Sequence, residues 1–313
     1  MRFCFGPVPS RRLGRSLGVD ILPRKTCNLN CIYCELGPTK TYTCGRAEYT
    51  SVSEICREIN EVIAGGADFD ALTITASGEP TLHASLGEIL ACARALTDRP
   101  LTVLTNGTLF VDPAVRRDVA PADVVLPSLD AALARSFRRV NRPALCVDFE
   151  GIVFGLESLR KEFTGRIWLE TLLVKGVNDT EEDLTALRKA YARIRPDAVH
   201  LNTVARPPAV SWARPLIGRE LEEARAFLQQ GLDVPIEIVV DTKRRLAEGF
   251  HPLLEREILD MLLRRPMRRD EIADLFGCGG DAVARVITGL LAQGRVREEP
   301  FEGKTYYRAA EDI

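Results

Sequence analysis

The sequence predicts an α/β fold, in which a partial (β/α)6 barrel is followed by a small C-terminal winged helix-turn-helix domain. Three observations support this prediction: the chain length, an alternation of apolar β-branched segments with helix-period segments, and a break in that alternation near Lys243. A chain of 313 residues can hold one barrel-type domain and one small domain. We place the boundary so that the predicted domains are 1–245 and 246–313.

The predicted barrel strands are apolar and rich in β-branched residues. They lie at 71–77, 101–107, 123–130, 166–174, 198–204 and 235–240. Helices are expected between them, and the first, at 51–66, begins with Ser51 and Glu54 at capping-box spacing and stops at two glycines. Alternating strands and helices with short loops are typical of a parallel sheet closed or partly closed into a barrel. Functional side chains are then expected at the C-terminal ends of the strands.

The C-terminal segment has a different pattern of expected helices and strands. Three short helices are expected at about 251–264, 268–276 and 279–293, followed by two short strands around Glu302 and Gly303, the element order of a winged helix-turn-helix. Residues 251–313 carry ten Arg or Lys against twelve Asp or Glu, and the third helix offers Arg285 as its single arginine. Recognition helices carry several polar and basic side chains, so DNA is disfavoured as a partner. A lid on the barrel mouth, a dimer contact, or contact with an RNA or an acidic partner stays open.

The composition is that of an ordinary soluble protein, with 46% hydrophobic and 27% charged residues. A formal net charge of −2 gives no overall electrostatic attraction to nucleic acid. The N-terminus has no apolar signal region, and no run approaches the roughly 18 apolar residues of a membrane span. We therefore expect a cytoplasmic protein without a membrane segment.

The stretch "KTCNLNCIYC" places Cys27, Cys31 and Cys34 at the spacing C-x3-C-x2-C. Nine cysteines at irregular spacings do not indicate a disulfide framework, so the other six are expected to be thiols, mostly buried. Structural zinc usually needs a second pair of ligands, which is missing, and a C-x2-C redox pair would leave Cys27 unexplained. Three thiolates on an iron–sulfur cluster leave one iron open to a cofactor or substrate. We favour the cluster over zinc and the redox pair.

This spacing, with the aromatic Tyr33 just before the last cysteine, resembles the signature of the radical S-adenosylmethionine (SAM) superfamily. The resemblance implies a [4Fe-4S] cluster whose fourth iron is chelated by SAM, with Tyr33 near the adenine. One electron from the reduced cluster then cleaves SAM to methionine and a 5'-deoxyadenosyl radical, which abstracts a hydrogen atom from substrate. A reductant such as flavodoxin or ferredoxin is implied as a partner.

Further residues are similar to SAM-binding positions of that superfamily. "ASGEPTL" resembles its glycine–glutamate motif, which implies that Glu79 accepts a hydrogen bond from the SAM ammonium and that Gly78 permits close backbone approach, while Ser77 stands where glycine is common. Three residues at the next strand ends resemble contacts to the SAM carboxylate and ribose. They are Asn106, Ser128 and Asp130. Loop capping by short polar side chains is the competing interpretation.

Candidate catalytic or substrate residues are polar groups in apolar strands and arginines at the predicted barrel mouth. They are Glu170, Asn202, Arg206, Arg11 and Arg12. A carboxylate in an apolar strand must be paired or hydrogen-bonded, and a guanidinium can bind a substrate carboxylate or phosphate. A buried structural network and solvated salt bridges are the alternatives.

A longer resemblance covers roughly residues 5 to 245. "GPVPSRRLGRSLGVDILPRKTCNLNCIYCELGPT", "NRP", "GVND" and "LNTVARPP" are similar to a subfamily related to the wyosine-type transfer-RNA-modifying synthases. Those synthases hold a second cluster through cysteines ahead of the signature, whereas here only Cys4 precedes it, so a single cluster is expected. Three functions remain open: a radical SAM enzyme with an unassigned substrate, a transfer-RNA-modifying enzyme, and an iron–sulfur sensor that regulates transcription through the winged helix.

Overall fold

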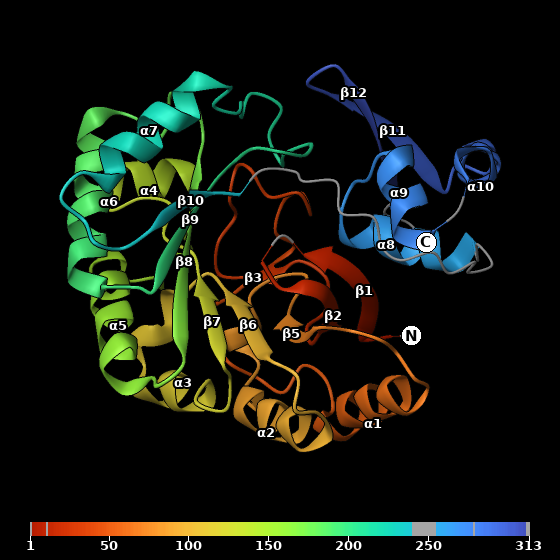
Figure 1. Cartoon of the computed structure of the whole chain (residues 1–313), viewed down its shortest axis with the longest axis horizontal. Helices are drawn as coiled ribbons and strands as arrows, with labels where there is room; N and C mark the ends of the chain where they lie inside the picture. Colours follow the sequence, from red (N-terminus) through yellow and green to blue (C-terminus); the bar gives the residue numbers. More distant parts are fainter. Residues whose placement is uncertain (1, 11, 240–254, 278, 311–313) are drawn as a thin grey trace.

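The computed structural model describes residues 2–10, 12–239, 255–277 and 279–310. It consists of a large α/β part, which ends at strand β10, and a C-terminal module, which begins at helix α8 (Figure 1). The predicted boundary at 245/246 lies outside the described residues, and so does Arg11.

One mixed eight-stranded sheet forms the centre of the large part. Its strand order is β1-β2-β5-β6-β7-β8-β9-β10. In chain order these strands are β1 (Cys4–Ser10), β2 (Gly14–Asp20), β5 (Ala71–Thr75), β6 (Leu101–Thr105), β7 (Val124–Pro127), β8 (Arg166–Leu173), β9 (Ala198–Thr203) and β10 (Ile236–Ile238). Strand β1 runs antiparallel to β2, and all other neighbours are parallel. Because β1 and β10 end the order without pairing with each other, the sheet is open, and the expected barrel is partial.

Helices cover the outer face of this sheet (Figure 1). They are α1 (Val52–Ala64), α2 (Leu86–Leu96), α3 (Pro113–Asp118), α4 (Ala134–Val140), α5 (Phe149–Glu162), α6 (Glu181–Ile194) and α7 (Arg219–Gln229). Helix α1 buries Ile55 and Ile59, four residues apart on one face, and ends at Gly65 as predicted. Its predicted capping box is wrong, because the hydroxyl of Ser51 bonds the hydroxyl of Ser53 and caps no backbone N–H.

The central strands are buried on both faces. Strand β7 is wholly buried, and β5 and β6 each have four buried residues of five. Their apolar side chains join one core with the helices, including Leu72, Ile74 and Val103. Thr73 of β5 is also buried and lines a cavity on the inner side of the sheet. The parallel strands therefore bring their C-terminal ends, and the loops that follow, to the edge of one cavity.

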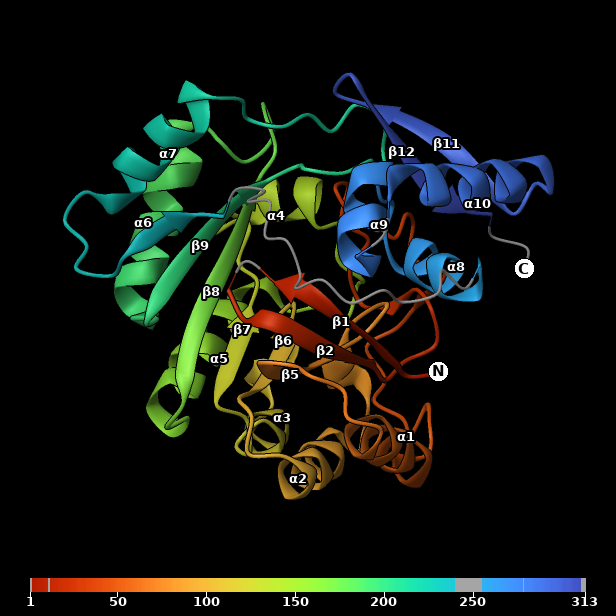
Figure 2. The same cartoon turned by 45° about the vertical axis from the view of Figure 1, so that its right-hand side comes forward.

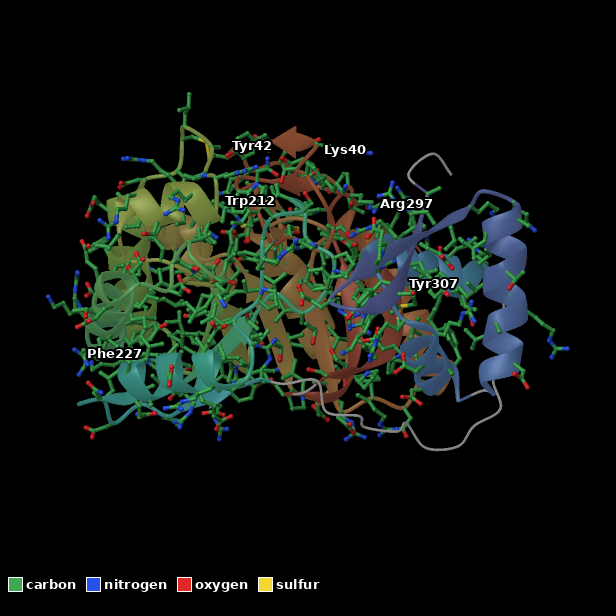
Figure 3. All side chains as sticks on the ribbon, turned by 90° about the horizontal axis from the view of Figure 1, so that it is seen from above. Lys40, Tyr42, Trp212, Phe227, Arg297 and Tyr307 are labelled. Carbon is green, nitrogen blue, oxygen red and sulfur yellow. A yellow bond between two sulfur atoms is a disulfide. The ribbon has the colours of Figure 1, made fainter. Side chains whose placement is uncertain are left out.

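The C-terminal module has its own hydrophobic core, built from side chains such as Ile258, Leu262 and Ile287. Its elements are α8 (Glu255–Arg264), α9 (Arg269–Phe276), α10 (Gly280–Ala292), β11 (Val296–Phe301) and β12 (Lys304–Ala309). This is the predicted order of three helices and a hairpin, while its assignment as a winged helix stays a prediction. Figure 2 shows the module beside β1, and two side chains of that strand, Phe5 and Val8, pack against its core. Seen from above, the hairpin with Arg297 and Tyr307 lies on the side of the molecule away from Phe227 of α7, with α10 beyond it (Figure 3).

No single helix among the described residues is long and apolar enough to cross a membrane, although α9 and α10 pass such a test together as a bent pair.

The cysteines outside the motif depart from the sequence-based expectation. Cys44 is joined to Cys146, and Cys56 is joined to Cys92, each with a Cα–Cα distance of 6.2 Å. The expectation of thiols at these four positions is wrong in this structure, because the fold brings together cysteines 102 and 36 residues apart in the chain. Cys4 is a buried free thiol, as expected, and the expectation for Cys278 lies outside the described residues.

Candidate cluster and cofactor site

The three motif cysteines lie on the loop that follows β2. Cys27 belongs to the short strand β3 (Thr26–Cys27), which pairs in parallel with β4 (Thr41–Tyr42). Cys34 closes a turn, because its N–H donates to the carbonyl of Cys31 at 3.1 Å. All three are free, partly exposed cysteines.

Desolvation raises the pKa of each of these thiols. The pKa of Cys27 rises to about 12, with a further contribution from the carboxylate of Glu79. The pKa of Cys31 is raised by burial, then by the charge of Asp130 and by the two other cysteines, and burial also raises the pKa of Cys34. Thiols in such surroundings ionise when a metal supplies positive charge. The donor set therefore fits a thiolate-ligated metal centre.

The arrangement of the thiols bears on which metal they hold. Within the described ranges, no three His, Cys, Asp or Glu side chains converge closely enough to hold one metal ion. A zinc ion needs its sulfur ligands at about 2.3 Å from a single centre, whereas a [4Fe-4S] cluster is held by one cysteine on each protein-bound iron. Three cysteines, one for each of three irons, fit such a cluster.

Two asparagines approach the sulfurs. The side-chain amide of Asn141 lies 3.4 Å from Cys31 Sγ and donates to Asp130 at 2.7 Å. The amide of Asn106 lies 3.8 Å from Cys27 Sγ and donates to Asn28 Oδ1 at 2.7 Å. Amide donors around the sulfurs tune iron–sulfur clusters. Sequence reasoning selected Asn106 and missed Asn28 and Asn141, although Asn28 lies inside the cysteine motif and Asn141 begins the "NRP" stretch.

Gly78 and Glu79 connect the second parallel strand, β5, to the cysteine loop. A Cβ at Gly78 would lie 1.8 Å from the carbonyl oxygen of Thr26, so only glycine fits this close approach. Glu79 is buried, and its carboxylate accepts hydrogen bonds from Thr105 Oγ1 and from the backbone N–H of Asn106, both at 2.6 Å. Burial raises the pKa of Glu79, and these hydrogen bonds oppose that shift. The motif thus anchors the cluster loop to the ends of β5 and β6, and its contact with SAM stays a prediction.

Ser77 has a partner that sequence reasoning missed. Its backbone N–H donates to Asp20 Oδ1 at 2.8 Å, and its hydroxyl donates to Asp20 Oδ2 at 2.5 Å. Asp20 is the last residue of β2, in the segment "GVDIL", so its position at a strand end was the available signal. The serine at this motif position therefore joins the C-terminal ends of two adjacent strands.

Tyr33 and Asp130 form one buried network. The hydroxyl of Tyr33 donates to Asp130 Oδ2 at 2.5 Å, and the other oxygen of Asp130 accepts from the backbone N–H of Leu172 at 2.9 Å. Burial raises the pKa of both groups, and for Asp130 the hydrogen bonds from Tyr33 and Asn141 act in the opposite direction. Tyr33 also lines the cavity, whereas Asp130 is buried and is not among its lining residues. The structure thus places Tyr33, but not Asp130, on the cavity wall.

The cavity beside Cys34 has a volume of about 520 Å³, within the range of roughly 300–1,000 Å³ that is typical of small-molecule sites. Sequence-predicted residues on its wall are Arg12, Tyr33, Ser77, Glu170, Asn202 and Arg206. Ser128 lies outside this set and is bridged to Glu170 in the sheet. The C-terminal module adds Met261, Arg264 and Arg265, so both parts of the chain form the cavity.

Glu170 of β8 is paired, as its apolar strand requires. Arg12 Nη1 donates to its carboxylate, and both side chains are about three-quarters or more buried. Desolvation and the charge of Arg12 lower the pKa of the neighbouring His200 to about 4, against an opposing effect of Glu170. His200 is therefore neutral near pH 7.

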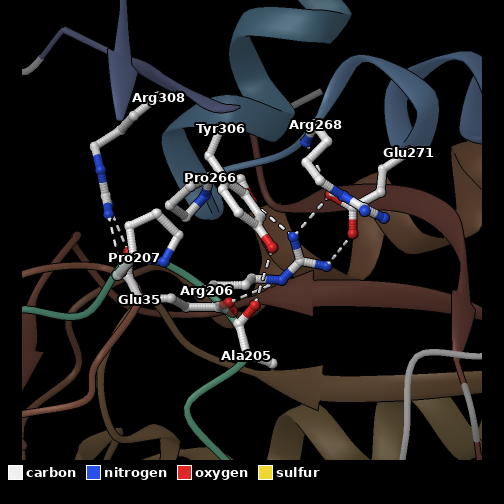
Figure 4. Close-up of polar contacts among 9 residues, drawn as sticks. All are labelled: Glu35, Ala205, Arg206, Pro207, Pro266, Arg268, Glu271, Tyr306 and Arg308. Atoms are coloured by element: carbon white, nitrogen blue, oxygen red, sulfur yellow. Dashed lines mark hydrogen bonds and ion pairs between the residues drawn. The ribbon is translucent and has the colours of Figure 1, made fainter. Parts of the chain in front are cut away.

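Arg206 lies at the junction between the sheet and the C-terminal module (Figure 4). Its two terminal nitrogens donate to the carboxylate of Glu271 at 2.8 and 3.0 Å, and its Nε lies 3.3 Å from Glu35. The structure thus pairs Arg206 with two carboxylates of the protein itself. Its predicted contact with substrate is not supported by this geometry.

A family model described as "Radical SAM superfamily" matches residues 21–187, more than half of the chain. The chain belongs to the radical SAM superfamily. It is an enzyme of this class, and its cofactors are a [4Fe-4S] cluster and SAM. The match includes all three cysteines, the Gly78–Glu79 motif and Asp130.

Several similar proteins extend beyond the matched region. The chain is 36% identical over 276 residues to a UPF0026 protein of Helicobacter pylori, covering 85% of each protein. It is 36% identical over 303 residues to a protein of Brachyspira hyodysenteriae named "GTPase Obg", covering 97% of this chain and 44% of that protein. Among solved structures, a radical SAM methyltransferase from Sphaerobacter thermophilus superposes with a TM-score of 0.53 at 17% identity, covering 71% of this chain and 66% of that one. This last likeness supports the fold alone.

Proposed function

We propose that this radical SAM enzyme uses a single [4Fe-4S] cluster to cleave SAM reductively and to abstract a hydrogen atom from a substrate held in the cavity beside Cys34. The observation that carries the proposal is that Cys34, one of three free motif cysteines, lines a cavity together with Tyr33 and Ser77. When bound, the cluster and SAM supply the electron and the carbon radical for this reaction.

The residues of the chain hold and orient these groups. We assign Cys27, Cys31 and Cys34 as the cluster ligands, and Asn106 and Asn141 as donors near two of their sulfurs. The proposed SAM contacts are Tyr33, Ser77, Gly78, Glu79, Asn106, Ser128 and Asp130. The Arg12–Glu170 pair and Asn202, also on the cavity wall, offer polar groups to substrate.

The position of the C-terminal module on the cavity wall favours a small substrate over a nucleic acid. Its residues Met261, Arg264 and Arg265 line the cavity, and Arg206 fastens the module to the sheet through Glu271. We propose that this module, with a winged-helix fold, acts as a wall of the active site. A transfer-RNA-modifying enzyme and a transcriptional sensor would both be retained strongly on heparin and released by salt, whereas a small-molecule enzyme would pass through.

Radical SAM enzymes generally need an electron donor. We propose a flavodoxin or ferredoxin in this role, in the cytoplasm. The donor is proposed because the cluster must be reduced by one electron. The cytoplasmic location is the sequence-based expectation.

The decisive test is electron paramagnetic resonance of anaerobically reconstituted, dithionite-reduced protein, with and without SAM, together with an assay for 5'-deoxyadenosine. We expect a [4Fe-4S]+ signal that changes on addition of SAM, with deoxyadenosine formed. Both should be lost in Cys34→Ala and kept in Cys4→Ala, which removes a thiol of β1 outside the motif. A cluster that is indifferent to SAM, or zinc in place of iron, contradicts the proposal.

A further inference from the structure

Among the residues that the structure describes, four arginines line the cavity: Arg12, Arg206, Arg264 and Arg265. Arg12 is paired with Glu170, and Arg206 lies between Glu271 and Glu35. Both are among the sequence-based candidates for binding a substrate anion, which also include Arg11. Because their charges are already matched by carboxylates of the chain, an anion would have to displace an internal partner to bind them.

Arg264 forms a longer ion pair, with Asp20 at 4.0 Å. Its side chain is only 18% exposed, and one terminal nitrogen donates to the carbonyl of Asp260, in the same helix, at 3.1 Å. Its Nε is buried and has no hydrogen-bond partner. The guanidinium stacks over the ring of Phe5, with its central carbon 4.7 Å from the ring centroid. The planar group is therefore held in a fixed orientation while part of its donor set remains unused.

The ion pair between Arg264 and Asp20 leaves the Nε–H of Arg264 without a hydrogen bond. Asp20 Oδ2 lies 4.0 Å from Nε, beyond hydrogen-bond distance. Both oxygens of Asp20 already accept hydrogen bonds from Ser77. The position of Arg264 at the C-terminal end of α8 accounts for its bond to the backbone, but it does not account for a buried Nε without a partner.

A largely buried guanidinium with an unused Nε–H costs free energy unless a ligand satisfies it. The group that matches a guanidinium through two parallel hydrogen bonds is an oxyanion, either a carboxylate or a phosphate. We propose that Arg264 binds an oxyanion of the substrate, so that the C-terminal module selects a small anionic molecule for the radical chemistry of the barrel. This inference rests on the function proposed above and adds the class of its substrate.

The test measures binding of two oxyanion probes, inorganic pyrophosphate and citrate, to the full-length protein without cluster and without SAM. Isothermal titration calorimetry is performed on the wild type, Arg264→Gln, Arg264→Lys and Arg256→Gln. Arg256 is the matched control because it lies on the same helix, is exposed and does not line the cavity. The phosphate and carboxylate probes distinguish the two sources of the anion.

We expect the wild type to bind at least one probe, and Arg264→Gln to weaken that binding about tenfold or more, as for a lost charge-assisted hydrogen bond. Arg264→Lys keeps the positive charge and should retain part of the affinity, so it controls for a folding defect in Arg264→Gln. Arg256→Gln should bind the probes as the wild type does. The proposal is overturned if neither probe binds the wild type, or if Arg264→Gln and the wild type bind equally tightly.

A second arm separates substrate from cofactor, because SAM carries a carboxylate of its own. SAM binding and deoxyadenosine formation are measured on the reconstituted variants. Loss of probe binding with unchanged SAM binding supports the proposal, whereas parallel loss of both assigns Arg264 to SAM and overturns it. If the wild-type cluster fails to respond to SAM, the proposed function fails, and the calorimetry on the cluster-free protein still reports on the anion site.

Discussion

Arg206 and Glu271 form a two-point ion pair between the sheet and the C-terminal module. Arg206 follows the C-terminal end of β9, and Glu271 lies in the first turn of α9. Both side chains are at least 85% buried, and Glu271 also accepts a hydrogen bond from the backbone N–H of Arg268 at 2.8 Å. The carboxylate thus caps its own helix and binds the neighbouring part of the chain at the same time.

Replacing Glu271 by Gln should reduce the stability of the module on the sheet. The variant keeps the shape of the side chain but loses a charge-assisted contact of Arg206, so the free energy of unfolding should fall by about 1.5–3 kcal/mol. Urea denaturation followed by circular dichroism measures this change. Asp274→Asn, on the same helix, is the control and should leave the midpoint nearly unchanged; an equal midpoint for Glu271→Gln would show that the pair contributes little.

The same pair predicts a dependence of stability on pH. Burial disfavours the ionised form of Glu271, but the hydrogen bonds and charge of Arg206 outweigh burial and lower its pKa. Because the folded-state pKa is lowered, the contribution is fully present above the unfolded pKa of about 4.3. It is lost as the pH falls through the folded-state pKa. Urea midpoints of the wild type and Glu271→Gln should therefore differ at pH 7 and converge below pH 4, and a constant difference would contradict this assignment.

Arg308 should stabilise the loop after Cys34. This buried side chain of β12 donates through Nε to both oxygens of Glu299, at 2.8 Å each, and through Nη1 to the carbonyl oxygen of Glu35. Arg308→Met leaves both partners without this donor, so a chelator should remove iron from the reconstituted cluster about tenfold faster. The loss of visible absorbance with time gives the rate.

The control for that experiment is Arg297→Met. Arg297 is the register partner of Arg308 on β11 and pairs with the same Glu299 at 3.0 Å, but its side chain is 56% exposed. It should leave the rate of iron loss unchanged. Equal effects of the two substitutions would mean that Glu299, rather than the contact with Glu35, controls the loop.

Asn141 should raise the reduction potential of the cluster. Its amide donates toward Cys31 Sγ, and such a donor stabilises the more negative, reduced form. Asn141→Leu should lower the potential by about 20–60 mV, the equivalent of one weak hydrogen bond. Spectroscopic redox titration measures the shift, with Asn60→Leu on the exposed side of α1 as control. An unchanged or raised potential would exclude a role for this amide at the cluster.

The sequence predicted those features that depend on local pattern. Strand segments and the order of the C-terminal helices follow from periodicity, and the cluster cysteines follow from their spacing. Contacts between residues that are far apart in the sequence could not be predicted. Arg12 and Glu170 are 158 residues apart, and Arg206 and Glu271 are 65 residues apart. The two disulfides and the Asp20–Ser77 contact belong to the same class. No short-range pattern distinguishes an arginine held by an internal carboxylate from one that is available to a ligand.

Strand β1 contributes Phe5 and Val8 to the core of the C-terminal module, so the earliest strand of the chain is covered by its last elements. During synthesis, these two apolar side chains of an edge strand stay without their packing partners until α8 and the elements after it have left the ribosome. An uncovered edge strand can pair with other chains. A nascent chain that has completed its sheet but lacks the module should therefore be the form most prone to aggregate, and the form most dependent on chaperones.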